Sequence, residues 1–315
     1  MSWKKENEKH EVWHTSDAVH HVPVLLHEGV SGLITHPDGV YVDATFGGGG
    51  HAREILKRLS DKGRLIAFDQ DAQAMKYVPE DKRLTFFNAN FRYMQRFLRA
   101  EGITKVHGIL ADLGVSSYQL DAAERGFSYR YNAPLDMRMN TAGKLTAADV
   151  LNESSEEKLV SIFSRYGEVR NSKKLAAEIV KARQSRQWRF TGELVQLCRS
   201  LSKGNPQRYL SQVFQAIRME VNDEASALET FLKQSAEVLN TGGRLAIITF
   251  HSIEDRMVKN FMKSGNIEGE HQKDEFGKIL KPFRLITKKP IVPRKEELKA
   301  NPRARSAKLR IAEKT

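Results

Sequence analysis

The sequence predicts an α/β fold with a doubly wound, mostly parallel sheet that an inserted α-helical domain interrupts. Short apolar runs alternate with amphipathic stretches over the first 112 residues, which is typical of strands buried on both faces of a parallel sheet. A glycine-rich turn follows the first of these runs. Only helical patterns occur from about residue 145 to residue 239, and an apolar strand then returns. The chain is therefore expected to build one sheet from both of its ends.

The first third of the chain contains four predicted strands joined by three predicted helices. Each strand is a short apolar run bounded by turn residues, as in the Leu-Ile-Ala-Phe of residues 65–68. Residues 116–145 are predicted to form a loop. In chain order the predicted elements are strand 39–45, helix 50–60, strand 63–69, helix 71–78, strand 83–88, helix 91–101 and strand 105–112.

The middle of the chain is predicted to be helical. Helices 155–166 and 172–186 place apolar residues three and four positions apart, on one face. An α/β rhythm that stops and later resumes predicts a discontinuous domain. We therefore expect residues 1–122 and 216–315 to form the α/β domain, and residues 123–215 to form a helical insertion.

The sheet is predicted to resume after the helices. Gly242 and Gly243 are expected to cap the last helix, because glycine commonly follows a helix C-terminus. The apolar run at 244–250 then predicts another central strand. Two later runs, residues 283–287 and 306–311, are expected to form a terminal antiparallel pair.

The composition excludes several classes of protein. With 40% hydrophobic and 8% aromatic residues among 315, the chain is globular rather than disordered. Its single cysteine, Cys198, excludes a disulfide framework, a structural zinc site and a cysteine-held iron–sulfur cluster, and we expect no metal site. Residues 1–16 are polar, and no apolar run approaches the roughly 18 residues of a membrane helix. We therefore expect a cytoplasmic protein that does not enter a membrane.

The net charge of +12 is concentrated in two segments. Residues 281–310 contain eleven Lys and Arg against two Glu, and residues 165–210 contain eleven against three. Together they exceed the net charge of the whole chain, so the remainder is acidic. Two basic segments on an acidic body favour a polyanionic partner, because such binding releases condensed counterions. RNA or DNA fits better than a membrane, since no amphipathic stretch combines a strongly basic face with aromatic anchors.

Residues 42–52, Val-Asp-Ala-Thr-Phe-Gly-Gly-Gly-Gly-His-Ala, predict a strand, a glycine turn and the start of a helix. Glycine has no Cβ, so such a turn can adopt positive φ and let a ligand approach the backbone. Asp69 ends the next predicted strand about 20 residues further on, where a carboxylate can accept both hydroxyls of a ribose. The chain is thus expected to bind an adenosine-containing cofactor at the carboxyl edge of a parallel sheet.

The glycine spacing alone leaves two cofactors open. Residues 47–52 satisfy the loose dinucleotide pattern of NAD-binding proteins. S-adenosylmethionine differs from NAD because its sulfonium is positive and it carries no phosphate. Asp43 and Asp112, at the ends of the first and fourth strands, suit a cationic ligand better than a pyrophosphate, which favours a helix N-terminus without acids. The charges therefore favour S-adenosylmethionine.

Ten segments of the chain carry a family resemblance, and those around Asp112, Asp136 and His251 are the most specific. The segments are residues 21–26 (His-Val-Pro-Val-Leu-Leu), 42–51, 112–121, 125–129 (Arg-Gly-Phe-Ser-Tyr), 134–139 (Pro-Leu-Asp-Met-Arg-Met), 166–168, 214–218, 242–245, 250–256 (Phe-His-Ser-Ile-Glu-Asp-Arg) and 301–306 (Asn-Pro-Arg-Ala-Arg-Ser). Together they resemble the RsmH (MraW) family, bacterial enzymes that methylate N4 of a cytidine in 16S ribosomal RNA. The resemblance extends from about residue 20 to residue 313.

The resemblance implies a class I, Rossmann-like methyltransferase that uses S-adenosylmethionine and carries a helical insertion. It implies cytidine 1402, in the decoding centre, as the target, and 16S rRNA in the small ribosomal subunit as the partner. The insertion is expected to recognise the substrate, and no obligate protein partner is expected. The family's cofactor contacts correspond to Gly49, Gly50, His51, Asp69, Phe91, Asp112 and Gln119, all identical here.

Several of these residues have an evident physical role. Phe91 could lie against the adenine, although core packing is the commoner role of a single phenylalanine. Gln119 offers both a hydrogen-bond donor and an acceptor. Asp112 ends the fourth strand, beside the expected position of the reacting methyl, and we expect it to be the catalytic proton acceptor. His51, Asp136 and His251 are the other candidates for this role. The alternative is that Asp112 only caps the following loop.

Candidate substrate-binding residues lie in three other segments. They are Asp136, Arg138, His251, Arg303 and Arg305. Arg303 and Arg305, together with Arg310, are expected to contact RNA phosphates. As an alternative, Asp136, Arg138 and His251 form a buried ion network with Asp255 and Arg256 that shapes the pocket.

The sequence departs from the family pattern at two places. Tyr118 stands where proline is common in the family, and the segment of residues 205–213 is longer than usual.

Methylation at carbon 5 of cytosine would need a cysteine nucleophile, but Cys198 lies away from any strand end, so direct transfer to an amine is favoured. The alternatives are a DNA or small-molecule methyltransferase, and a ribosome-assembly factor that only senses the cofactor. Asp69 and Asp112, with the glycine turn, favour an enzyme.

Overall fold

A computed structural model describes residues 23–271, 273, 275, 276 and 281–315 of the chain. The polar residues 1–16 and two residues of the family resemblance, His21 and Val22, lie outside the described residues. No helix in the described part of the chain combines the length and apolar character needed to cross a membrane.

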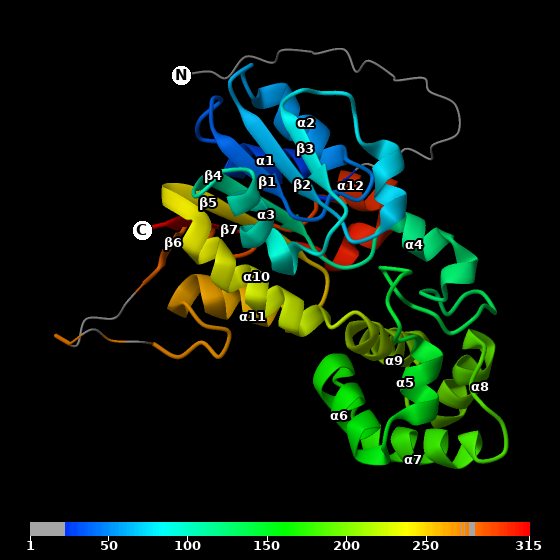
Figure 1. The fold of residues 1–315 in the computed structure, drawn as a ribbon. Coiled ribbons are helices and arrows are strands. Elements are labelled where there is room, and N and C mark those ends of the chain that lie inside the picture. The colour runs from blue at the N-terminus through cyan, green and yellow to red at the C-terminus, as the bar shows by residue number, and fades with distance from the viewer. Residues whose placement is uncertain (1–22, 272, 274, 277–280) are drawn as a thin grey trace.

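The strands are β1 (Val40–Asp43), β2 (Arg64–Phe68), β3 (Leu84–Phe87), β4 (Val106–Asp112), β5 (Leu239–Thr249), β6 (Phe283–Leu285) and β7 (Lys308–Lys314). They form a seven-stranded sheet in the order β3-β2-β1-β4-β5-β7-β6 (Figure 1). The first five strands in this order are parallel, and β7 is antiparallel to both β5 and β6. The predicted parallel sheet and terminal antiparallel pair are confirmed.

Helices cover both faces of the sheet, which makes the fold doubly wound. They are α1 (Leu26–Leu33), α2 (Gly50–Arg58), the 3₁₀ helix η1 (Ala72–Tyr77), α3 (Met94–Ala100), α10 (Glu224–Val238) and α11 (Ser252–Ser264). Side chains of α1, α2 and η1 pack against one face, and those of α3, α10 and α11 against the other. Within β4, Leu110 joins the first cluster while Ile109 and Ala111 join the second. Burial on both faces explains the continuous apolar runs.

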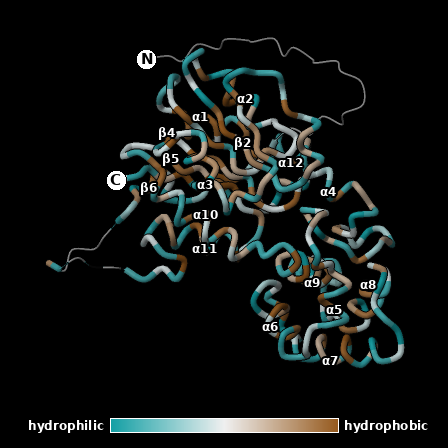
Figure 2. Tube along the Cα trace, viewed as in Figure 1, coloured by the Kyte–Doolittle hydropathy of each residue, from teal (hydrophilic) through white to brown (hydrophobic). Residues whose placement is uncertain are grey.

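A helical segment lies beside the sheet (Figure 1) and contains α5 (Ala147–Glu153), α6 (Glu156–Gly167), α7 (Ser172–Arg183), α8 (Thr191–Leu201) and α9 (Pro206–Val221). It has its own hydrophobic cluster, to which α6 contributes Leu159, Ile162 and Phe163 at helical spacing. The strongest hydrophobic colour otherwise gathers in the strands of the sheet (Figure 2). The two helices predicted here are confirmed. The expected domain boundary at residue 215 falls inside α9, and the division into domains stays a prediction.

The expected glycine cap before the returning strand is wrong. Helix α10 ends at Val238, and both Gly242 and Gly243 lie within β5. The pairing of β4 with β5 shifts between Val106 and Gly108, so that β5 contains extra residues at this point. Gly242 has a φ of +79° there, which glycine adopts without strain. The two glycines therefore lie in the irregular first part of β5.

Two other segments differ from the prediction. Residues 72–77 form the 3₁₀ helix η1, because Pro79 holds the preceding residue in an extended conformation and leaves no room for a longer helix. Residues 116–145 are not wholly loop, since the Ser116 side chain caps a short helix. The remaining short elements are η2 (Phe91–Tyr93), α4 (Ser117–Asp121), η3 (Ala123–Arg125), α12 (Lys295–Ala300) and η4 (Pro302–Ser306).

Candidate active site

Four strands end at one edge of the sheet, and each end carries a polar side chain. Asp43 and Asp112 are the last residues of β1 and β4, Asp69 directly follows β2, and His251 lies two residues beyond β5. Because these strands are parallel, their carboxyl ends meet at the same edge, where open α/β sheets bind ligands. The structure thus brings together the side chains predicted for this edge.

Asp69 holds the glycine turn between β1 and α2. Its Oδ2 accepts a 2.7 Å hydrogen bond from the amide of Gly47, and its Oδ1 accepts a 2.8 Å bond from the amide of Asp71. Gly47 and Gly49 have φ values of +52° and +76°, which glycine adopts without strain. Burial raises the pKa of Asp69 to about 6, although the two backbone donors oppose this. A carboxylate has about four acceptor positions, so Asp69 can still accept from a ribose diol.

We expect Gly50→Ala to lower the free energy of unfolding by about 1–3 kcal/mol, the usual cost of overpacking. A Cβ on Gly50, the first residue of α2, would collide with the ring of Pro23. Gly48, in the same turn, is the matched control, because a Cβ there would have no heavy atom within 4 Å. Urea unfolding of both variants checks the prediction. Equal midpoints for the two variants would contradict it.

His51, in the first turn of α2, is buried and lies beside the half-buried Asp112. Its Nδ1 is 3.8 Å from Oδ2 of Asp112, and burial lowers the pKa of the imidazole to about 4, so the ring is neutral at pH 7. Within the described structure, Asp43 Oδ2, His51 Nε2 and Asp112 Oδ1 are buried without a hydrogen-bond partner. Such atoms are rare because each has lost its hydration without compensation. Together they indicate a site for a polar ligand.

The two aspartates hold their protons tightly. Burial raises the pKa of Asp43 to about 7. Burial also raises the pKa of Asp112 well above its ordinary value, and the carboxylates of Asp43, Glu254 and Glu297 add to this. A cation bound beside these groups would lower both pKa values and replace the missing partners. The arrangement therefore suits a sulfonium or ammonium group and disfavours a pyrophosphate.

We expect Asp43→Asn to gain stability relative to the wild type as the pH rises from 4 to 7. The unfolded chain releases the Asp43 proton near pH 3.8, but the folded chain holds it to about pH 7. The folded state thus binds more protons in this window, and Asp43 lowers stability as the pH rises. The relative gain should reach roughly 1.4 kcal/mol per pH unit.

Urea unfolding of the cofactor-free proteins at pH 5, 6 and 7 measures this gain. His51 titrates in the opposite sense, because its pKa is lowered by folding, but it does so in both proteins and cancels in the difference. A difference between the two proteins that does not change with pH would show that Asp43 is ionised throughout.

The remaining predicted cofactor contacts, Phe91 and Gln119, both have protein partners. Phe91 is half-buried in η2, with its ring centroid 5.1 Å from that of Phe231. Gln119 is buried in α4, where its Oε1 accepts from the Ser116 amide and its Nε2 donates a 3.0 Å hydrogen bond to Asp71. Their contact with the cofactor stays a prediction.

Asp71 and Arg125 form a buried ion pair to which the sequence assigned no role. The Arg125 guanidinium lies 3.1 Å from Oδ2 of Asp71, the same oxygen that Gln119 contacts. Arg125 also donates to the carbonyl oxygens of Arg138 and Met139. This pair therefore ties the loop after β2, at the cofactor edge, to the loop that leads into the helical segment. Asp71 stands two residues after Asp69, but its partner is visible only in the fold.

Asp136 and Arg138 pair with each other instead of joining a larger network. Their carboxylate and guanidinium lie 2.7 Å apart, and Arg138 also donates to the carbonyl oxygens of Thr141 and Gly143. The predicted alternative, one buried ion network, is not formed. The other members pair separately, Asp255 with Arg310 and Arg256 with Glu168.

His251 caps α11 and contacts an acidic group. Its Nε2 lies 3.1 Å from Oε1 of Glu254, which is buried. Potential metal-ligand atoms of Glu224, His251 and Glu254 lie within 4.8 Å of one another, a grouping that the sequence did not predict. Arg218 already donates hydrogen bonds of 2.7 and 2.8 Å to Glu224. Arg218 thus neutralises the carboxylate of Glu224.

The C-terminal arginines differ in their surroundings. Arg303 and Arg305 are exposed on η4, and Arg303 donates a 3.1 Å hydrogen bond to Asp121 at the end of α4. Arg310 lies in β7 with its side chain only 11% exposed, and its Nε is 2.7 Å from Asp255. Replacing Arg310 would break an internal ion pair, so it is unsuitable as a probe of RNA contact. Arg303 and Arg305 remain suitable.

Comparison with known proteins agrees with this geometry. The profile of the MraW methylase family matches residues 18–315. A "Ribosomal RNA small subunit methyltransferase H" of Bacteroides thetaiotaomicron is 54% identical over 95% of this chain and 98% of that protein. Proteins of the same name from Parabacteroides distasonis (52% identical; 95% and 98% covered) and Flavobacterium psychrophilum (53% identical; 92% and 100% covered) are similar. The chain belongs to the MraW methylase family, and S-adenosylmethionine is its cofactor.

Proposed function

We propose that the chain transfers a methyl group from S-adenosylmethionine to N4 of a cytidine in 16S rRNA, at cytidine 1402 in the decoding centre of the small ribosomal subunit. The observation that carries the proposal is the set of buried polar atoms without a partner at the cofactor edge, on Asp43, Asp112 and neutral His51. The names of the relatives support ribosomal RNA of the small subunit as the substrate. The family resemblance supports the cytidine amine.

For this reaction the protein must mainly align the amine with the methyl group and provide a proton acceptor. Bound S-adenosylmethionine supplies an electrophilic methyl group on a positively charged sulfur. As the amine nitrogen gains the methyl, it must lose a proton. Asp112 has a buried oxygen without a partner, Oδ1, at the end of β4, and accepts this proton. A cation bound beside Asp112 favours its ionised form, which is the form that accepts the proton, and its burial makes this carboxylate a stronger base than an exposed aspartate.

The state of Cys198 argues against methylation at carbon 5 of the base. That reaction needs a thiolate that adds to the ring. Cys198, the single cysteine of the chain, is buried in α8 within the helical core, and burial raises the pKa of its thiol to about 12. Such a thiol is neither ionised nor accessible. Direct transfer to an amine needs no such nucleophile.

The RNA is proposed to lie across η4 and the helical segment. Arg303 and Arg305 are exposed cations on η4, and the helical segment carries the second basic stretch, residues 165–210. In this proposal residues 123–215 recognise the substrate. Asp136, Arg138 and His251 then act by shaping the loops around the base, since each is engaged with a neighbouring side chain.

The test uses small ribosomal subunits from cells that lack this protein. They are incubated with the protein and methyl-labelled S-adenosylmethionine, and the RNA is digested to nucleosides for mass spectrometry. Labelled N4-methylcytidine is the expected product. Label only in added DNA would favour a DNA methyltransferase. Cofactor binding without any labelled nucleoside would favour an assembly factor that senses the cofactor.

A further inference from the structure

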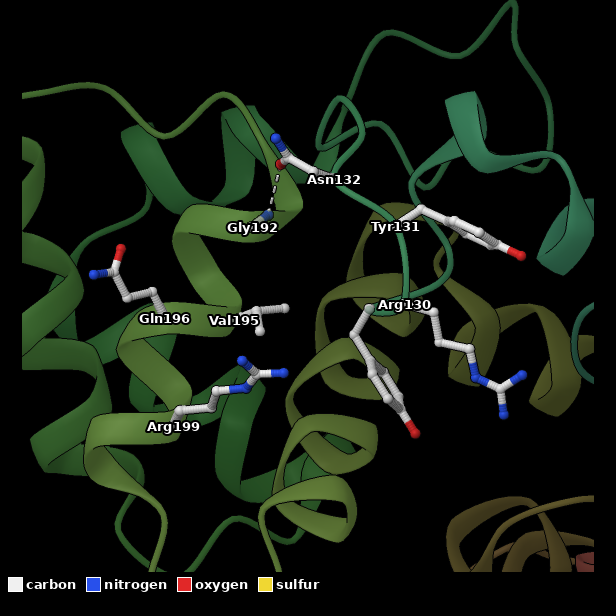
Figure 3. A pocket seen from close by; sticks show the side chains of 8 residues that line it. Arg130, Tyr131, Asn132, Gly192, Val195, Gln196 and Arg199 are labelled. Carbon is white, nitrogen blue, oxygen red and sulfur yellow. Dashed lines mark hydrogen bonds between the residues drawn. The ribbon is translucent and has the colours of Figure 1, made fainter.

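A pocket of about 330 Å³ opens in the helical segment, between the loop of residues 129–132 and helix α8. Figure 3 shows Val195 and, one turn further along α8, Arg199 on the side of the helix that faces the loop, while the side chains of Arg130 and Tyr131 extend from the loop away from α8. The volume is at the small end of the range for ligand pockets, which runs from about 300 to 1,000 Å³. It can therefore admit a group of about the size of one nucleotide, but not a double helix.

The walls of the pocket are held by specific hydrogen bonds. The Thr191 hydroxyl donates a 2.6 Å bond to the carbonyl oxygen of Tyr131 and accepts a bond from the amide of Ala133. The Asn132 side chain accepts a 3.1 Å bond from the Gly192 amide, drawn in Figure 3. These bonds fix the loop on the first turn of α8. The pocket is thus a preformed feature and not a chance gap between mobile segments.

The pocket presents cations and aromatic rings. Arg130 and Arg199 are both exposed, and the described lining of the pocket contains no carboxylate. Tyr129 and Tyr131 supply rings, and the side chain of Tyr131 is 48% exposed. Guanidinium groups bind phosphate, and exposed aromatic faces stack on bases. The combination is typical of sites for single-stranded nucleic acid.

The loop of this pocket also borders the C-terminal basic element. Tyr131 lies near Arg303 of η4. Arg303 in turn bonds to Asp121, at the end of α4. Arg125, which contacts Asp71 at the cofactor edge, precedes Arg130 by five residues, a span of at most roughly 18 Å. The loop of the pocket is thus joined through Arg125 to the cofactor edge and lies near η4.

We propose that this pocket and the loop beside it bind an unpaired segment of the RNA substrate that flanks the methylated nucleotide, with phosphates on Arg130 and Arg199 and a base on Tyr131. The proposal rests on the proposed function, because it assumes an RNA substrate. It goes beyond it by placing the flanking segment outside the cofactor edge, in the helical segment. A base in a duplex is stacked and paired, so the target region must be single-stranded or opened to reach both places.

The first test is binding to a fluorescent single-stranded oligoribonucleotide that carries the cytidine and its natural flanks, measured by anisotropy over a range of salt concentrations. The double variant Arg130→Gln/Arg199→Gln should bind at least about tenfold more weakly. The slope of log K against log salt should shrink by about 1.4, or 0.7 for each lost contact with a single strand. Tyr131→Ala should weaken binding roughly 5- to 150-fold and leave the slope unchanged, while Tyr131→Phe, which keeps the ring, should bind as the wild type does.

Arg99→Gln is the matched control, because Arg99 is an exposed arginine on α3, away from the pocket. It should change neither affinity nor slope. With small subunits as substrate, the pocket variants should raise KM and leave kcat unchanged, because the pocket does not touch the reacting atoms.

The two proposals can fail separately. If the wild type makes N4-methylcytidine and the pocket variants match it in affinity, slope and KM, the pocket proposal is overturned and the function stands. If the wild type makes no N4-methylcytidine, the proposed function fails, and a loss of RNA binding in the variants would still support the pocket. Equal loss in Arg99→Gln and in the double variant would overturn the pocket, since it would show a general charge effect.

Discussion

Asp112→Asn is expected to lower the rate of methyl transfer about 10²- to 10⁴-fold, the usual contribution of a positioned general base. Asparagine keeps the shape of the side chain but cannot accept a proton from the amine. The effect should be large because Oδ1 of Asp112 is buried without a partner at the end of β4. A single-turnover assay with small ribosomal subunits and labelled cofactor measures the chemical step directly.

Calorimetry of cofactor binding accompanies this measurement, because Asp112 is also a predicted cofactor contact. A rate loss much larger than the loss in cofactor affinity assigns Asp112 to proton transfer. If the two losses are equal, Asp112 acts only by holding the cofactor. Asp61→Asn, at an exposed aspartate, is the control and should leave both quantities unchanged. An unchanged rate in Asp112→Asn would show that the proton leaves to water instead.

Asp71→Asn is expected to lower the free energy of unfolding by about 3–5 kcal/mol, the cost of breaking a buried ion pair from one side. Asp71 and Arg125 are both buried, and the variant would leave the guanidinium without its carboxylate. Gln119, which donates to the same carboxylate, would lose a charged acceptor. Urea unfolding measures the change. Cofactor affinity should fall too, because Asp69 accepts a hydrogen bond from the Asp71 amide.

The control for this variant is Asp223→Asn. Asp223 also pairs with an arginine from a distant part of the chain, Arg92, but its side chain is 56% exposed. An exposed pair contributes at most about 1 kcal/mol. Asp223 has a φ of +48°, which asparagine tolerates well. Similar losses in the two variants would mean that burial does not set the strength of the Asp71–Arg125 pair.

The strands of the sheet were predictable because their burial on both faces produces a recognisable run of apolar residues in the sequence. Strands such as β2 and β4 must be apolar at nearly every position, and this pattern marks them without knowledge of their neighbours. The same reasoning located Asp43, Asp69 and Asp112, since a polar residue that ends an apolar run stands at the edge of the sheet. Gly242 was misassigned because glycine serves helix ends and strand bulges alike.

The contacts of the site were less predictable, because they depend on packing between distant segments. Nothing in the sequence around Arg125 shows that its partner is Asp71. The pairing of His251 with Glu254 is local, but the nearby Arg218 and Glu224 come from other helices. Side-chain partners of this kind follow from the arrangement of elements, which a single sequence does not specify. The sequence therefore predicted which types of residue lie at the site, but not which side chains contact one another.

The order of the strands has a consequence for how the chain folds. Strands β4 and β5 are neighbours in the sheet, yet the whole helical segment is made between them, and β7, which pairs with both β5 and β6, is made last. Contacts between distant residues form slowly, because a long loop must close first. The helical segment has its own hydrophobic cluster, built within residues 127–217. We therefore expect a nascent chain to acquire its helical core early, and to become able to bind its cofactor only when the sheet closes around the completed β5.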